Sequence, residues 1–305
     1  MKMRNLLLMI FGVIFVVTIS LVLILFNKLD QLLYNPLITP EMWCEEEPCH
    51  LINLFGRSFT FIQPLSTFIV YLLGLITIGI GIYLLVKRES QKSRTWWGIA
   101  LVVWGMGTML AGTSYQAFGY ELKCEGNTLC LWTSLFEIFY LLLTVFSVNA
   151  MMMSQVESSS TGKWRTFQTW FAPINSIIYS LILVVGSILP FRFLISFELM
   201  ILFVIPSMLM FFINNIVRYI KYKTRMEIML IFVWVLMLIV MIGYYTTALM
   251  DLTEIMWSRG IWFSDNDVLH IGLIAWMFYV GFTVKNHVVD LPSDFSGINI
   301  EVGKH

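Results

Sequence analysis

The chain has 305 residues, of which 58% are hydrophobic and 12% are charged, and its formal net charge is zero. A mean hydropathy of +0.81 over this length excludes a soluble globular domain, and we expect no nucleic-acid partner. The composition predicts an all-α integral membrane protein. Its apolar runs match the length of about 20 residues that a spanning helix needs, and they are far longer than the about 9–11 residues of a membrane barrel strand.

Eight apolar runs are long enough to cross a membrane. They cover residues 5–26, 61–86, 96–118, 131–153, 169–189, 194–216, 228–250 and 268–286. The first run follows a positively charged start, as a signal peptide would, but it exceeds the length of a signal h-region and no small-residue cleavage site follows it. We therefore interpret it as an uncleaved anchor. The predicted organisation is an anchor (1–26), an outer acidic loop with cysteines (27–60), a seven-helix core (61–288) and a polar cytoplasmic tail (289–305), which we expect to be disordered.

The basic residues are distributed unevenly between the connections. Fourteen of the nineteen Lys and Arg residues fall at the two termini, in the connections 87–95, 154–168 and 217–227, and at Lys285. The opposite connections hold the other five, together with eleven acidic residues. Since cytoplasmic loops carry the excess of Lys and Arg, both termini are predicted to be cytoplasmic. The acidic loops then lie on the non-cytoplasmic side of the cell membrane or an equivalent membrane.

All four cysteines, Cys44, Cys49, Cys124 and Cys130, fall in the predicted outer connections. That side is oxidising, so we expect disulfides there. Local pairs 44–49 and 124–130 would each close one loop, whereas crossed pairs would join the two loops, and the sequence does not choose between them. A zinc site made by Cys44, Cys49 and His50 is the rival interpretation, but its spacing does not fit a zinc finger or ribbon.

Polar residues within the spans gather near the outer membrane face. Glu137 lies within an uncharged run, about 9 Å below the predicted outer end of its helix at 1.5 Å per residue. A carboxylate at such depth is costly and indicates a functional site or an interior network. Further polar residues at outer helix ends are Gln63, Ser66, Ser114, Gln116, Glu198, Asp251 and His270. This layer predicts an outward-facing polar pocket.

Several short motifs in this layer are similar to those of a known superfamily. They are Trp43-Cys44-Glu45, Gln63-Pro64-Leu65-Ser66-Thr67, Gly112-Thr113-Ser114-Tyr115-Gln116-Ala117-Phe118, Phe136-Glu137 and Asn266-Asp267-Val268-Leu269-His270-Ile271-Gly272. In their order and their helix assignments, these motifs resemble the alkaline ceramidases and the adiponectin/progestin receptors, over roughly residues 43–140 and 262–282. The resemblance implies a seven-helix fold and a site for three zinc-binding His residues with Asp and Ser nearby.

The resemblance implies a membrane-embedded hydrolase that cleaves lipid amide bonds, as a ceramidase does. In that role Ser114, Glu137 and His270 would be catalytic, and Gln63, Ser66, Gln116 and Glu198 would contact the substrate. A metal would be held by His270, Glu137 and Asp267.

Two of the family's three zinc His residues are replaced, by Phe118 and Asn266, and three protein ligands are the usual number at a catalytic zinc. Tight zinc binding is therefore disfavoured. The alternatives are a non-catalytic protein of the same fold that binds a lipid or a small amphiphile, and an unrelated transporter or scaffold. In each case membrane lipids are expected partners.

Overall fold

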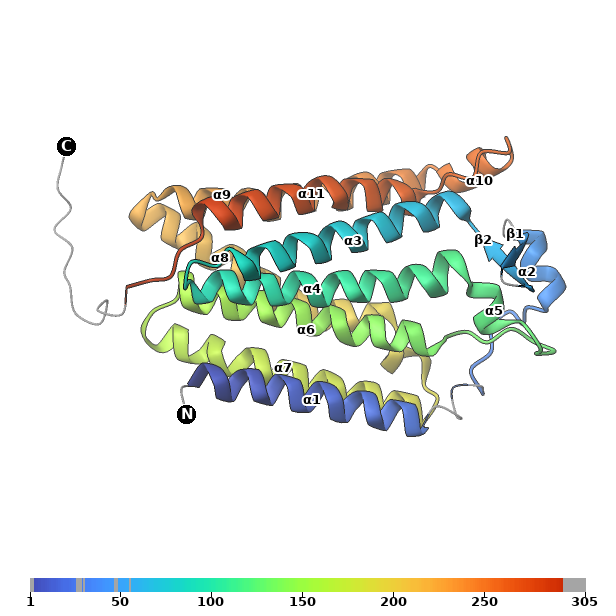
Figure 1. Ribbon diagram of the computed structural model, residues 1–305, viewed down its shortest axis with the longest axis horizontal. Helices are drawn as coiled ribbons and strands as arrows, with labels where there is room; N and C mark the ends of the chain where they lie inside the picture. The colour runs from blue at the N-terminus through green and yellow to red at the C-terminus, as the bar shows by residue number, and fades with distance from the viewer. Residues whose placement is uncertain (1–2, 26–28, 30, 47–48, 55, 293–305) are drawn as a thin grey trace.

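The computed structural model describes the chain except for residues 1–2, 26–28, 30, 47–48, 55 and 293–305, and it shows a bundle of long helices (Figure 1). The long helices are α1 (Met3–Leu25), α3 (Pro64–Val86), α4 (Lys92–Gly112), α6 (Leu135–Ser158), α7 (Gly162–Ile188), α8 (Phe197–Tyr222), α9 (Arg225–Leu249) and α11 (Asp265–His287). The short elements are α2 (Pro40–Glu46), α5 (Gly119–Lys123), α10 (Leu252–Trp257), a π-helical turn η2 (Thr113–Ala117) and a 3-10 turn η3 (Arg192–Ile195).

Among the described residues, seven helices have the length and apolar composition to cross a membrane. They are α3, α4 with η2, α6, α7, α8, α9 and α11. This result confirms a multi-pass helical membrane protein. The eighth predicted span is not established, because the apolar stretch that α1 offers, Gly12–Leu21, is shorter than a span requires. Helix α1 packs along α7 at the edge of the bundle (Figure 1).

The bundle is centred on α6. Of the most apolar stretch of α6, 78% is buried inside the protein, compared with 22% for α9, which lies at the periphery. Helices α3 and α4 form the closest pair, and glycines permit their approach. A Cβ atom on Gly81 would lie 2.8 Å from the carbonyl oxygen of Gly98, and one on Gly98 would lie 2.9 Å from the carbonyl oxygen of Gly81. Such small-residue seams are typical of helices packed within membranes, where close backbone contact replaces the hydrophobic effect.

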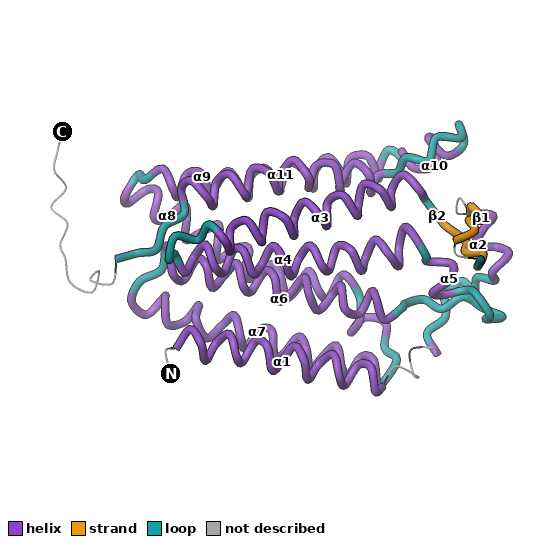
Figure 2. Tube along the Cα trace, viewed as in Figure 1, coloured by secondary structure: helices purple, strands orange, loops and turns teal. Residues whose placement is uncertain are grey.

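The predicted outer loop contains regular structure that the sequence analysis missed. Strands β1 (Cys49–Leu54) and β2 (Arg57–Ile62) form an antiparallel hairpin at one end of the bundle (Figure 2). Gly56, with a φ of 77°, lies in the turn, where a residue without a Cβ is favoured. The hairpin extends two residues into the predicted span 61–86, and the helix begins only at Pro64, a residue suited to a first helical turn.

Both disulfides are local. Cys44 is bonded to Cys49, and Cys124 to Cys130. The structure therefore chooses between the connectivities that the sequence left open. It also excludes the zinc site at Cys44, Cys49 and His50, because a cysteine in a disulfide has no thiolate to offer a metal.

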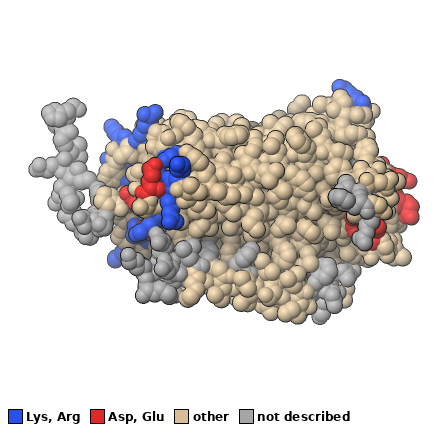
Figure 3. Space-filling model, in the orientation of Figure 1, with Lys and Arg blue, Asp and Glu red and all other residues tan. Residues whose placement is uncertain are grey.

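The end of the bundle opposite the β-hairpin is basic. Figure 3 shows Lys and Arg side chains around a few acidic ones at this end, whereas the other end has a patch of Asp and Glu side chains and a smaller group of Lys or Arg. The expectation of a disordered tail is wrong for its first residues. Asp290 accepts hydrogen bonds from the backbone N–H groups of Lys92 (2.7 Å) and Ser93 (2.8 Å) at the start of α4. Leu291 N–H donates to the Glu157 carbonyl (2.9 Å). A carboxylate at a helix N-terminus satisfies free N–H groups and complements the helix dipole. The rest of the predicted tail, 293–305, lies outside the described residues.

Candidate functional site

Glu137 lies in the first turn of α6. The predicted run began at residue 131, but the helix begins at Leu135, and Ser134 is its N-cap, with an extended backbone and a side chain that accepts from the Glu137 N–H (3.4 Å). Serine is a strong N-cap residue, and an acidic side chain in the first turn favours the helix start. The predicted position about 9 Å below the end of the helix is therefore wrong, because the residues before Ser134 belong to the preceding extended segment.

The Glu137 carboxylate is buried and accepts hydrogen bonds from two neighbouring hydroxyl groups. Ser114 Oγ donates to Oε1 (2.8 Å), and Thr133 Oγ1 donates to Oε2 (3.1 Å). Ser114 also shares a hydrogen bond with Ser134 (2.7 Å). Ser114 comes from the π-helical turn at the end of α4, and such turns are frequent at functional sites. The structure thus brings Ser114 and Glu137 together.

Lys123 completes this network, and the sequence analysis did not identify it. Its Nζ lies 2.5 Å from Glu137 Oε1, and the two side chains are 3% and 6% exposed. The ammonium also lies over three aromatic rings, 5.0 Å from the centre of Tyr115, 5.8 Å from Trp43 and 5.9 Å from Tyr34, within range of cation–π attraction. Burial is the largest single influence and acts to lower the pKa of Lys123, but the charge of Glu137, the neighbouring Tyr34 and the hydrogen bonds to both together raise this pKa above its usual value.

One feature of the sequence pointed to Lys123. It is one of only five basic residues on the acidic side of the chain, and it directly precedes a cysteine. The Cys124–Cys130 disulfide holds together the two segments that supply the partners of Glu137: Lys123 comes immediately before it, and Thr133 follows it by three residues. The backbone bond from Leu131 N–H to the Lys123 carbonyl (2.8 Å) closes the same loop.

A second polar cluster joins the N-terminal ends of α3 and α11. Asp267 Oδ2 accepts from Ser66 Oγ (2.9 Å), from Ser264 Oγ (3.1 Å) and from Ser264 N–H (2.7 Å), the last as part of a capping box. Among the described residues, Asp267 Oδ1, His270 Nδ1 and Gln116 Oε1 are buried without a hydrogen-bond partner. Asp267 and His270 are three residues apart on one helix, so they share a face.

One of the predicted substrate contacts lies elsewhere. Glu198 occupies the first turn of α8 and is exposed, so the structure does not bring it into either cluster. Helix ends that share a membrane face need not point their side chains inward, because rotation about the helix axis decides that. Gln63 lies at the start of α3 with a φ of 44°, and its carbonyl accepts from the N–H (2.9 Å) and the hydroxyl (3.0 Å) of Thr67.

The donor set does not fit the zinc that the resemblance implies. The described residues contain no group of three or more His, Cys, Asp or Glu side chains placed to hold a metal. Glu137 is paired with Lys123. Phe118, at a position of a family His, has its ring edge-on to Phe59 (6.2 Å) and Phe61 (5.8 Å) of β2. A predicted ligand position is therefore part of an aromatic contact between the hairpin and the core.

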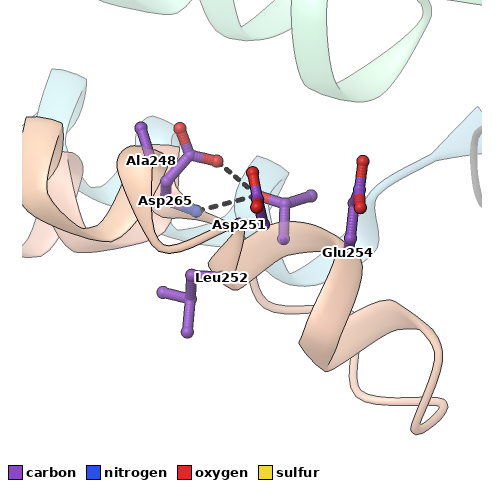
Figure 4. A pocket seen from close by; sticks show the side chains of 6 residues that line it. Ala248, Asp251, Leu252, Glu254 and Asp265 are labelled. Atoms are coloured by element: carbon purple, nitrogen blue, oxygen red, sulfur yellow. Dashed lines mark hydrogen bonds between the residues drawn. The ribbon is translucent and has the colours of Figure 1, made fainter.

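The end of the bundle that carries the β-hairpin also has an open cavity of about 300 Å³, which lies between α9, α10 and α11 (Figure 4). It is lined by Ala248, Asp251, Leu252, Thr253, Glu254 and Asp265. Thr253 Oγ1 donates to Asp265 Oδ1 and accepts from the Asp265 N–H. Asp251 of the predicted polar layer lines this cavity, but none of the predicted catalytic, substrate-binding or metal-binding residues does, so it is not the predicted pocket.

Comparison of the chain with protein-family models, with curated proteins and with solved structures gives no match.

Proposed function

We propose that this membrane protein binds an amphiphilic lipid at the outer end of its seven-helix core and does not hydrolyse it. In this proposal, α1 is an additional membrane anchor and both termini are cytoplasmic. It keeps the resemblance to the ceramidase and adiponectin/progestin receptor superfamily as a guide to the fold and to the position of the pocket, without the hydrolytic chemistry.

The buried ion pair between Lys123 and Glu137 is the observation that carries the proposal. A general base needs a lone pair free to accept a proton from water or substrate. Lys123, Ser114 and Thr133 instead occupy three of the about four acceptor sites of the Glu137 carboxylate, and Lys123 neutralises its charge, which makes it a weak base. Ser114 donates to the same carboxylate, so its hydroxyl proton is also engaged. These contacts therefore favour a structural role for these residues, in which they hold the helix ends together, over a catalytic role.

The unpartnered polar atoms support a binding role. Leaving a buried donor or acceptor unpaired costs about 1–3 kcal/mol, so such groups in native proteins are usually met by water or a ligand. Asp267 Oδ1 and His270 Nδ1 lie on α11, and Gln116 Oε1 lies on η2, elements that both pack against α3. The two oxygens can accept hydrogen bonds from the hydroxyl and amide N–H groups of a lipid headgroup, and the His270 nitrogen can accept or donate one, while the lipid chains lie in the membrane.

A fluorescent short-chain ceramide tests binding and hydrolysis with one probe. Purified protein should bind it saturably, and His270→Phe should weaken binding about fivefold or more, as expected for the loss of about 1 kcal/mol from one hydrogen bond. Glu198→Gln, at an exposed carboxylate on the same membrane face, is the matched control and should bind like wild type. No fatty acid should be released beyond a protein-free sample, with or without added zinc.

Two outcomes would contradict the proposal. Repeated turnover of the probe that is lost in Glu137→Gln and in Ser114→Ala would show a hydrolase. Binding that is absent, or equal in His270→Phe and wild type, would remove the proposed pocket.

A further inference from the structure

A second groove lies on the lipid-facing surface at the basic end of the bundle, far along α3 and α11 from the polar clusters. Its volume is about 340 Å³. Helix α3 contributes Ile80 and Tyr83, and α11 contributes Phe278, Gly281 and Phe282, with Lys285 and Asn286 at the end of the groove. The α11 residues are spaced by three or four positions, so they form one face of that helix.

The floor of the groove is set by a close helix contact. A Cβ atom on Gly281 would lie 2.8 Å from Cγ2 of Ile80, so α11 can approach α3 here only because this residue has no side chain. The walls are aromatic and open to the membrane, since Tyr83, Phe278 and Phe282 are 48%, 58% and 55% exposed. The shape suits an extended acyl chain that lies against rings.

Charge distinguishes this groove from ordinary lipid-facing surface. Helices α3 and α11 run in the same direction, so both end at the basic face (Figure 1). Lys285 lies at that end of α11, and Lys87 and Arg88 directly follow α3 and are exposed. Each helix therefore runs from an apolar stretch to a basic end at the same depth, which complements a lipid with apolar chains and an anionic headgroup.

Lys285 already has one anionic partner. Its Nζ lies 2.5 Å from Glu89 Oε1, and the Glu89 side chain is 60% exposed and also paired with Arg94 (2.6 Å). Exposed ion pairs are weak and are easily exchanged. A phosphate can therefore compete with Glu89 for Lys285, and Glu89 keeps Arg94 when it does.

We infer that this groove binds one anionic phospholipid of the leaflet at the basic end, with the phosphate at Lys285 and Lys87 and an acyl chain against Phe278 and Phe282. Basic pockets between transmembrane helices on the cytoplasmic side are known binding places for anionic headgroups. This site is separate from the outer pocket of the proposed function, and neither depends on the other.

Native mass spectrometry of the full chain in detergent, titrated with phosphatidylglycerol or with phosphatidylcholine of the same acyl chains, tests the inference. Phosphatidylglycerol should bind more tightly. Lys285→Gln should reduce its binding about fivefold, as expected for one Lys near an anionic headgroup, and Lys87→Gln should reduce it in the same direction. Glu89→Gln should strengthen binding, because it removes the internal competitor. The affinity for phosphatidylcholine should not show this pattern of losses and gain across the three variants.

Lys163→Gln is the matched control, since Lys163 is an exposed lysine at the same end of the bundle, on α7 and outside the groove. Three outcomes would overturn the inference. These are equal binding of the two lipids by wild type, an equal loss in Lys163→Gln and Lys285→Gln, and weaker phosphatidylglycerol binding in Glu89→Gln.

Discussion

The ammonium of Lys123 and the carboxylate of Glu137 form an ion pair at 2.5 Å between α5 and α6, and almost no part of either side chain is exposed. The two residues are separated by a disulfide-closed loop and by the extended segment that leads to Ser134. The pair therefore joins the short helix α5 to α6, the most central helix. A substitution of either residue alone leaves the other as a buried charge without a counter-charge.

Lys123→Met should destabilise the protein strongly. The substitution leaves Glu137 as a buried carboxylate without its counter-charge, which typically costs about 3–5 kcal/mol. The double variant Lys123→Met/Glu137→Met should recover most of this loss, because a buried pair replaced by apolar groups is often close to neutral. Thermal unfolding in detergent measures both, with Lys163→Met as an exposed control. A double variant no more stable than Lys123→Met would contradict a direct pairing of the two charges.

The two disulfides should differ in their resistance to reduction. Cys44 is exposed, whereas Cys124 and Cys130 are fully buried, and thiol–disulfide exchange requires access to sulfur. In a dithiothreitol titration followed by maleimide mass tagging, Cys44–Cys49 should open first. Cys124–Cys130 should open only together with loss of thermal stability, because its loop carries the partners of Glu137. A Cys44→Ser/Cys49→Ser variant isolates the second bond, and early opening of that bond in folded protein would refute the expectation.

The topology can be tested at two exposed serines. Ser90 lies between α3 and α4 at the basic end, and Ser258 follows α10 at the other end. With the four native cysteines in disulfides, Ser258→Cys should react with a membrane-impermeant maleimide on intact cells. Ser90→Cys should react only after permeabilisation. The opposite pattern would reverse the proposed orientation.

Glu89 should contribute to stability only above acidic pH. Hydrogen bonds from Lys285 and Arg94, together with their charges, lower the pKa of this carboxyl in the folded protein. A group whose folded pKa is depressed stabilises the fold above its unfolded pKa, near 4.3 for Glu, and that contribution is lost as the pH falls through the folded pKa. The melting temperature of wild type should therefore exceed that of Glu89→Gln at pH 7, and the difference should vanish toward pH 3. A difference that is constant with pH would assign the effect to packing.

Asn149 should stabilise the middle of the bundle. Its amide donates to Ser176 (2.8 Å), and its oxygen accepts from Asn175 (3.2 Å) and Ser207 (3.1 Å), which links α6 to α7 and α8. Interhelical hydrogen bonds in membranes contribute about 0.6 kcal/mol each on average, so Asn149→Leu should cost about 2 kcal/mol. Thr246→Val, which removes a hydroxyl bonded only within its own helix, is the control. An equal effect of the two substitutions would argue against the network.

The sequence alone predicted the membrane class, the helices of the core to within several residues, and the gathering of polar residues at one pole. These properties depend on local composition, since a membrane requires long apolar runs and separates basic from acidic connections. The sequence also placed Ser114 and Glu137 at that pole, because each lies at the end of a recognisable apolar run.

Only the tertiary structure decided which side chains meet. It paired Lys123 with Glu137, chose the local disulfides, exposed Glu198, folded the hairpin and attached Asp290 to the start of α4. Each of these outcomes depends on the rotation of a helix about its axis or on a contact between distant segments. Hydropathy along the chain carries no information about either, because residues on every side of a spanning helix can be apolar whether they face lipid or protein.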